Sequence, residues 1–224
     1  MKTRYITKSR FKLALECPTK IFYDGKAEYA NKKNEDSFLL ALADGGFQVG
    51  ELAKYYFKGG HDIKTISYDE ALAQTNELLK KEEVIIYEAA VSFGNFFIRA
   101  DILVKKGSFI ELIEVKAKSF DGNGEEGFLN KNGSISSSWQ EYLYDVAFQK
   151  FVMEKAFPEH TISANLMMVN KNAICPTDGL NQKFKIIKDK TGRKDVLVSK
   201  DLSEKDLESP ILSKVNVDKC CDIL

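Results

Sequence analysis

Apolar residues in the first third of the chain recur with the spacing of amphipathic helices. This spacing predicts a short helix and a turn within residues 9–22, with a Cys-Pro pair as the helix stop. An apolar stretch that begins at Asp36 is interrupted by Gly45-Gly46, and a second helix is predicted over residues 47–57. After a glycine-containing loop, residues 68–81 show the helical period again.

In the middle of the chain the pattern changes to apolar runs rich in Val, Ile and Phe. These runs span residues 84–91, 96–104 and 109–117, and short turn-like pieces separate them. We interpret them as a three-stranded antiparallel meander. A segment rich in Gly, Asn and Ser follows over residues 119–137 and predicts a loop.

Helical spacing returns after this loop. Residues 139–157 predict a helix that ends before Pro158, and the compact apolar run 161–169 is typical of a buried strand. A helix followed by such a strand predicts a crossover that returns the chain to the same sheet. Alternation in residues 184–188 and 195–198 predicts a hairpin.

Together these elements predict a single α/β domain over residues 1–224, with a central mixed β-sheet flanked by helices. Its parts are a helical N-terminal part (8–81), a sheet and helix (83–170), and a C-terminal hairpin and tail (183–224). A chain of 224 residues is long enough to bury one substantial core and short for two.

The composition is that of an ordinary globular protein, with 44% hydrophobic and 29% charged residues. No apolar run reaches the length of a membrane span, and the N-terminus is charged where a signal peptide would be apolar. We therefore expect a cytoplasmic protein without a membrane partner. Lys plus Arg equals Asp plus Glu at 33 each, so the basic footprint of many nucleic-acid binders is missing from the total. Local basic patches can still exist within a neutral total.

Two carboxylates and an amine are predicted to converge on the meander. Side chains alternate along a strand, so Glu114 and Lys116 point to one face, and the neighbouring strand can bring Asp101 beside Glu114. Carboxylate oxygens suit Mg²⁺ or Mn²⁺, and a Lys can orient a water or stabilise a phosphate. This set meets the needs of phosphodiester hydrolysis. By itself a Glu-x-Lys motif is more often a surface charge pair, but its place at the end of an apolar strand favours a functional site.

Further polar residues are candidates for supporting roles. Glu51 lies on a predicted helix after glycines, and Gln140 and Tyr144 share one helical face that can contact a phosphate or a base. Glu88 lies inside an apolar strand, where it is either a supporting carboxylate, a ligand of a second metal or, more plainly, a residue of an edge strand or of a salt bridge. Arg99 is expected to pair with Asp101, and contact with phosphate is the alternative.

In their order along the chain these residues resemble the PD-(D/E)XK nuclease superfamily and its RecB-like branch, which includes CRISPR-adaptation exonucleases and helicase-linked repair nucleases. The resemblance spans roughly residues 5 to 170. It rests on Ser9-Arg-Phe with Glu16-Cys17-Pro18, Gly50-Glu51, Asp101, Glu114-Val115-Lys116 and Gln140-x-x-x-Tyr144. Many members carry His where this chain has Glu51, which is a departure from the pattern.

The resemblance implies a restriction-endonuclease-like core and a deoxyribonuclease that depends on Mg²⁺ or Mn²⁺. The implied metal ligands are Glu51, Asp101, Glu114 and the Val115 carbonyl. Lys116 would assist the attacking water, and Gln140 and Tyr144 would grip single- or double-stranded DNA. A helicase or another nucleic-acid-processing protein is an expected partner. Long bacterial proteins also resemble this chain in their N-terminal region, which leaves open that it is part of a longer protein.

Some RecB-like relatives join one N-terminal Cys to three C-terminal ones in an iron–sulfur cluster. Here the candidates are Cys17, Cys175, Cys220 and Cys221, two of which are adjacent, and no C-x-x-C spacing occurs. We therefore do not favour a cluster. Two alternatives to the nuclease hypothesis stay open. One is a catalytically silent nucleic-acid-binding or assembly module with the same fold, and the other is a metal-free structural domain with an exposed charge pair.

Overall fold

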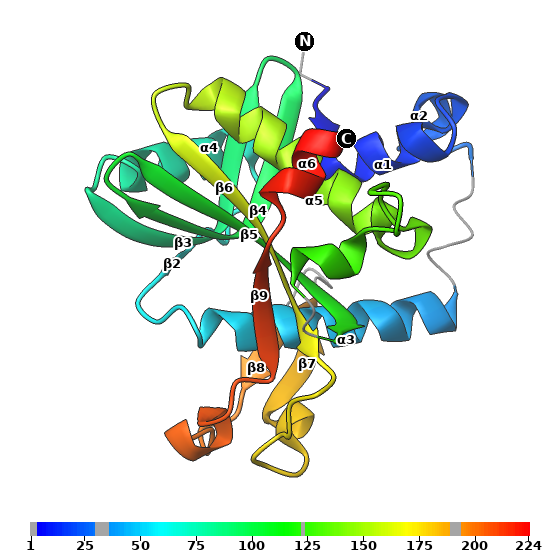
Figure 1. Ribbon diagram of the computed structural model, residues 1–224. Coiled ribbons are helices and arrows are strands. Elements are labelled where there is room, and N and C mark those ends of the chain that lie inside the picture. Colours follow the sequence, from blue (N-terminus) through cyan, green and yellow to red (C-terminus); the bar gives the residue numbers. More distant parts are fainter. Residues whose placement is uncertain (1–3, 30–35, 122–123, 189–193) are drawn as a thin grey trace.

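The computed structural model describes residues 4–29, 36–121, 124–188 and 194–224. A seven-stranded mixed sheet forms its centre, in the order β2-β3-β4-β5-β6-β9 with β1 paired to β4 (Figure 1). The strands of this sheet are β1 (Ile6–Thr7), β2 (His61–Asp62), β3 (Glu83–Phe93), β4 (Phe96–Lys106), β5 (Phe109–Phe120), β6 (Thr161–Asn170) and β9 (Leu212–Asn216). A separate hairpin consists of β7 (Phe184–Lys188) and β8 (Lys194–Val198).

Helices lie on both faces of the sheet, as the sequence predicts for an α/β domain (Figure 1). The helices are α1 (Lys8–Glu16), α2 (Thr19–Tyr23), α3 (Ser37–Lys54), α4 (Tyr68–Leu78), α5 (Ser137–Ala156) and α6 (Asp218–Ile223). Short 3-10 helices occur at Glu125–Phe128, Leu180–Lys183 and Glu204–Leu207. Within the described ranges, no helix combines the length and the hydrophobicity that crossing a bilayer requires.

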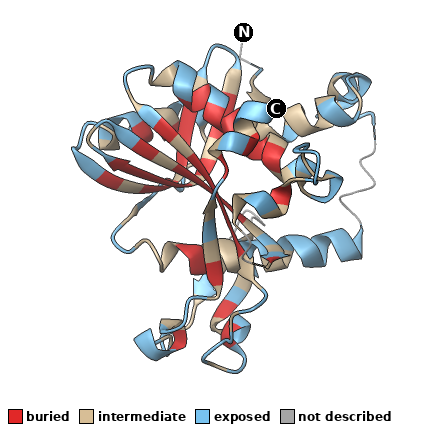
Figure 2. Ribbon diagram, viewed as in Figure 1, coloured by how far each residue is buried: buried red, intermediate tan, exposed pale blue. Residues whose placement is uncertain are grey.

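Two apolar cores form because the central strands are buried on both faces (Figure 2). Leu112 of β5 belongs to the core under α4 and α5, which also contains Leu143 and Val152 of α5. The next residue, Ile113, points to the opposite core, where it lies with Leu52 of α3. The alternation of β5 therefore directs Glu114 toward α5 and Val115 toward α3.

Several predicted elements are confirmed. The meander is β3, β4 and β5, and both neighbouring pairs of strands are antiparallel. The crossover is also present, since β6 follows α5 and pairs parallel with β5. β7 and β8 form the predicted antiparallel hairpin. Its expected turn, Lys190-Thr-Gly-Arg, lies outside the described residues.

Other predictions need correction. Gly45-Gly46 does not interrupt a helix, because α3 continues through it and ends at Lys54 instead of residue 57. Each helical glycine costs roughly 1 kcal/mol relative to Ala, and the burial of Leu52 and Ala53 under the sheet offsets this cost. The predicted turn after α1 contains α2, and the 119–137 loop begins later, because β5 extends to Phe120.

The C-terminal tail is also more integrated than predicted. β9 adds an edge strand to the main sheet by pairing antiparallel with β6. Val217 and Cys220 are fully buried in the core under α5. The tail therefore completes the central sheet and its core.

The ladder of hydrogen-bonded pairs opens where β3, β4 and β5 meet. Pairing of β3 with β4 passes from Tyr87↔Ile102 to Ala89↔Ala100 and skips Glu88, which has a positive φ of 57°. Pairing of β4 with β5 begins at Ile102↔Ile113, so Asp101 and Glu114 are next in register. A positive φ at a non-glycine residue costs of order 1–3 kcal/mol and is often found at functional sites.

Candidate active site

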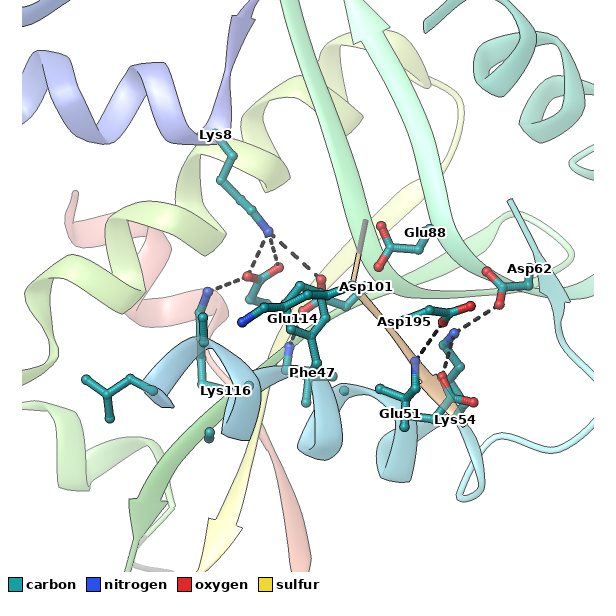
Figure 3. A pocket seen from close by; sticks show the side chains of 18 of the residues that line it. Lys8, Phe47, Glu51, Lys54, Asp62, Glu88, Asp101, Glu114, Lys116 and Asp195 are labelled. Atoms are coloured by element: carbon teal, nitrogen blue, oxygen red, sulfur yellow. Dashed lines mark hydrogen bonds and ion pairs between the residues drawn. The ribbon is translucent and has the colours of Figure 1, made fainter. Parts of the chain in front are cut away.

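A cleft of about 810 Å³ lies where this ladder opens, and it is lined by α3 and also by Lys8 of α1 and Tyr142 of α5 (Figure 3). Its lining comes from segments far apart in the sequence. They include Lys8 of α1, Glu51 of α3, Glu88 of β3, Asp101 of β4, and Glu114 and Lys116 of β5. The three residues at the centre of the sequence prediction therefore line one cleft.

Glu114 is the most buried carboxylate of this cleft, with a side chain only 1% exposed. Lys116 Nζ donates to Oε1 at 2.5 Å, and Lys8 Nζ donates to Oε1 at 2.8 Å and to Oε2 at 3.0 Å. Gln149 Nε2 of α5 donates to Oε2 at 2.8 Å. Although burial acts in the opposite direction, Lys116 and Lys8 hold the pKa of Glu114 well below its usual range. Glu114 is therefore ionised at neutral pH.

Asp101 lies beside Glu114 but in a different electrostatic setting. Its Oδ2 accepts a 2.7 Å hydrogen bond from the Val115 backbone N–H, so the side chain replaces a ladder bond where the strands separate. Lys8 Nζ is 4.0 Å from its Oδ1. Burial and the Glu114 carboxylate raise the pKa of Asp101 to about 7. The two adjoining carboxylates thus differ strongly in proton affinity, a pattern typical of functional sites.

Two further site residues, Asp145 and Gln149, come from the buried face of α5. Asp145 Oδ2 accepts a 2.7 Å bond from Lys116 Nζ, and Gln149 contacts Glu114 as described. Asp145 Oδ1 and Gln149 Oε1 are buried and have no hydrogen-bond partner among the described residues. Sequence reasoning missed this pair, but a signal exists, because both residues lie on the helix stripe that also carries Val152.

Gln140 and Tyr144 lie away from the cleft. Gln140 Nε2 donates to the Tyr144 hydroxyl at 3.3 Å on an exposed part of α5, and neither residue lines the cleft. Tyr142 does line it, together with Lys118, whose Nζ is 4.8 Å from the Tyr142 ring centroid and 4.5 Å from that of Trp139. The α5 contribution to the cleft wall is therefore Tyr142.

Glu51 lies in the same cleft but in a second group of charges (Figure 3). Its carboxylate pairs with Lys54 at 3.0 Å, and Lys54 also pairs with Asp62 at 3.0 Å. The structure therefore brings Asp101 and Glu114 together and leaves Glu51 with its own partner.

Glu88 and Arg99 flank the opened ladder. Burial raises the pKa of the Glu88 carboxyl, while Lys8, Lys54 and Arg99 oppose that rise. Arg99 donates to the backbone carbonyls of Ile63 and Thr65, at 3.2 and 2.5 Å. Arg99 thus holds the segment after β2 against β4.

The residues at Asp101 and Glu114 fit a hard divalent ion in their chemistry. They offer carboxylate oxygens, which are the ligands that such an ion prefers. The unpaired oxygens Asp145 Oδ1 and Gln149 Oε1, called the orphaned oxygens below, could accept hydrogen bonds from the waters bound to the ion. In the described residues, however, no group of three or more His, Cys, Asp or Glu side chains is spaced to hold a metal. Mg²⁺ in proteins is often bound by one or two carboxylates and keeps several waters, so a two-carboxylate site meets its needs.

The four cysteines are free thiols at different places in the fold. Cys17 caps the end of α1, Cys175 is exposed, and Cys220 and Cys221 belong to α6. Burial raises the pKa of both α6 thiols to about 12, so they are protonated at neutral pH.

No family model, curated protein or solved structure matches the chain.

Proposed function

We propose that this chain is a metal-dependent nuclease that hydrolyses phosphodiester bonds in DNA, built on a restriction-endonuclease-like version of its mixed sheet. The main support is the convergence of Asp101, Glu114 and Lys116 in one open cleft. The resemblance of the sequence to PD-(D/E)XK nucleases assigns roles to the same three residues. Burial of an ionised Glu114 is costly, which makes a chance surface charge pair a poor account of the site.

The contacts of these residues suggest a role for each of them in the proposed reaction. Mg²⁺ or Mn²⁺, when bound, would neutralise charge on the phosphate and supply an activated water. Asp101 and Glu114 would hold the ion, and Gln149 fixes the orientation of Glu114. Although burial opposes it, Glu114 and Asp145 raise the pKa of Lys116 above its usual range. In the metal-free site Lys116 is therefore an ammonium, which can orient water and stabilise negative charge.

A neutral chain can still contact DNA through this cleft. Six lysines of the described ranges line it beside an equal number of Asp and Glu side chains: Lys8, Lys54, Lys64, Lys116, Lys118 and Lys194. Ammonium groups contact phosphates, and Tyr142 adds a ring on which a base can stack. Gln140 and Tyr144 would then contact nucleic acid outside the cleft.

One observation favours the catalytically silent module as a second candidate. Glu114 is already neutralised by two ammonium groups, so the folded state does not require a metal at this position. A binding module with this site would retain DNA affinity and show no cleavage with any divalent ion.

Cleavage of linear, circular and single-stranded DNA in Mg²⁺ or Mn²⁺ tests the proposal. Glu114→Gln and Lys116→Met should each lower the rate by about a hundredfold or more, because each removes charge at the reacting phosphate. The matched control is Glu111→Gln on the same strand, since Glu111 pairs with Lys214 at 2.9 Å and does not line the cleft.

Glu111→Gln should cleave like the unmodified protein. Equal rates for Glu114→Gln and the unmodified protein would reject the site. DNA binding without cleavage in both metals would favour the silent module.

A further inference from the structure

The Lys8 ammonium lies between the two central carboxylates (Figure 3). Its Nζ is 2.8 and 3.0 Å from the two oxygens of Glu114 and 4.0 Å from Asp101 Oδ1. Lys8 is 106 positions from Glu114 in the sequence, so tertiary packing alone brings it there. A monovalent cation of the chain thus faces both carboxylates that the proposed function assigns to a divalent ion.

We propose that Lys8 occupies the cation position of the metal-free site and that a divalent ion binds only after the Lys8 side chain withdraws. The inference rests on the proposed function, because it concerns the same pair of carboxylates. An ammonium hydrogen-bonded to both oxygens of Glu114 leaves this carboxylate no room for an ion, so the two cations compete for it.

The hydrogen bonds to Glu114 support displacement over joint occupancy. Its two oxygens already accept four hydrogen bonds, two from Lys8 and one each from Lys116 and Gln149. An ionised carboxylate has about four acceptor positions. A divalent ion at Glu114 therefore requires one of these donors to leave, and Lys8 is the donor that also faces Asp101.

Lys8 can withdraw without movement of its backbone. The residue follows β1, which pairs with β4, and it begins α1, whose N-cap is Thr7. The Phe11 ring stacks on Phe148 of α5 at 4.4 Å and fixes the helix. The Lys8 side chain itself is 26% exposed, so rotation of its flexible stem carries the ammonium into solvent.

Displacement also gives the orphaned oxygens a role. Within the part of the chain that the structure describes, Asp145 Oδ1 and Gln149 Oε1 have no donor while Lys8 is in place. Waters bound to an ion at Glu114 are strong donors and can satisfy acceptors nearby. In the metal-free site the Glu114 oxygens thus have hydrogen-bond donors, whereas the two orphaned oxygens of Asp145 and Gln149 lack them within the described ranges.

A titration with Mn²⁺ in the absence of DNA tests the inference through metal affinity. Lys8→Met keeps the length of the side chain and removes its charge. If the site must open before it binds, its apparent affinity is reduced by the fraction of open molecules, so the variant should bind Mn²⁺ roughly 10- to 100-fold more tightly. The matched control is Lys12→Met on the same helix, where Lys12 pairs with Glu141 outside the cleft, and its affinity should not change.

The outcomes separate this inference from the proposed function. Tighter binding by Lys8→Met than by the unmodified protein supports it, including the case in which only the variant binds. Equal or weaker binding by the variant overturns the inference and leaves the nuclease proposal standing. Absence of binding by both proteins rejects the metal site itself. If Lys8→Met does not fold, Lys8→Gln retains a donor for Glu114 and is titrated in its place.

A spectroscopic measurement follows the ammonium directly. In lysine ¹⁵N–¹H spectra of the metal-free protein, the Lys8 ammonium should exchange its protons slowly because Glu114 accepts two of its hydrogen bonds. Saturating Mg²⁺ should abolish this protection, while the Lys116 signal persists. Retention of a protected Lys8 signal in the metal-bound protein would overturn the displacement.

Discussion

Replacement of Asp145 by asparagine should have opposite effects on stability, depending on whether Lys116 is present. The Asp145 side chain is 2% exposed, its Oδ2 accepts a 2.7 Å bond from Lys116, and its Oδ1 has no partner. In the unmodified protein, Asp145→Asn weakens a charge-assisted hydrogen bond and should cost about 1–2 kcal/mol. In a Lys116→Met background, Asp145 is a buried charge that has lost its cation, and the same change should stabilise by about 1–3 kcal/mol.

The difference between the two backgrounds is a coupling energy of about 2–5 kcal/mol, at or above the upper end of the values found for contacting groups. Urea unfolding of the four proteins in EDTA measures it as a double-mutant cycle. The exposed pair Glu111–Lys214, at 2.9 Å, is the matched control and should give about 0–1 kcal/mol. If Asp145→Asn destabilises both backgrounds equally, Lys116 and Asp145 do not form a buried pair in solution, and the proposed positioning of Lys116 fails.

Three further predictions concern the surroundings of this pair. Burial and the Glu114 carboxylate raise the pKa of Asp101 to about 7, above its unfolded value of about 4, so its protonated form stabilises the metal-free protein and stability should fall as the pH rises between these two values. Urea unfolding of Asp101→Asn should show a flatter pH profile, whereas equal slopes would contradict this. Phe11→Ala removes the 4.4 Å ring stack on Phe148 and should lower the melting temperature measurably; an unchanged melting curve would mean that α1 is not docked as described. Tyr144→Ala, compared with Gln140→Ala, should weaken DNA binding in fluorescence anisotropy by about fivefold or more through lost stacking, and unchanged affinity in both would remove these residues from the DNA interface.

The central geometry was predictable because it depends on local rules. Strand alternation places Glu114 and Lys116 on one face, and their 2.5 Å contact confirms it. Antiparallel pairing brings Asp101 into register with Glu114, although the ladder opens before that pair forms. No local rule predicts that Glu88 leaves the β3–β4 ladder, because a positive φ is uncommon for a non-glycine residue.

Helix α5 was predicted correctly, but the site residues predicted on it were incomplete. Gln140 and Tyr144 are four apart, as are Asp145 and Gln149, so spacing alone does not separate the two pairs. Their relation to the apolar stripe does, because Asp145 and Gln149 are buried with Val152 and the first pair is not. Polar residues on the buried face of a helix require partners, and that requirement is the better sequence signal.

Lys8 could not be found this way, because its role depends on where the N-terminal segment docks. The parallel pairing of β1 with β4 and the ring stack of α1 on α5 together aim its side chain at Glu114. Without that ammonium, Glu114 would keep its hydrogen bonds from Lys116 and Gln149 but lose two others, and its burial would be more costly. The segment that looks peripheral in the sequence therefore stabilises the charge on which the proposed chemistry depends. A divalent ion can bind only if its interaction with the site is stronger than this Lys8–Glu114 contact. We therefore expect that changes at Lys8 that stabilise the metal-free fold lower the metal affinity of the site, and the reverse.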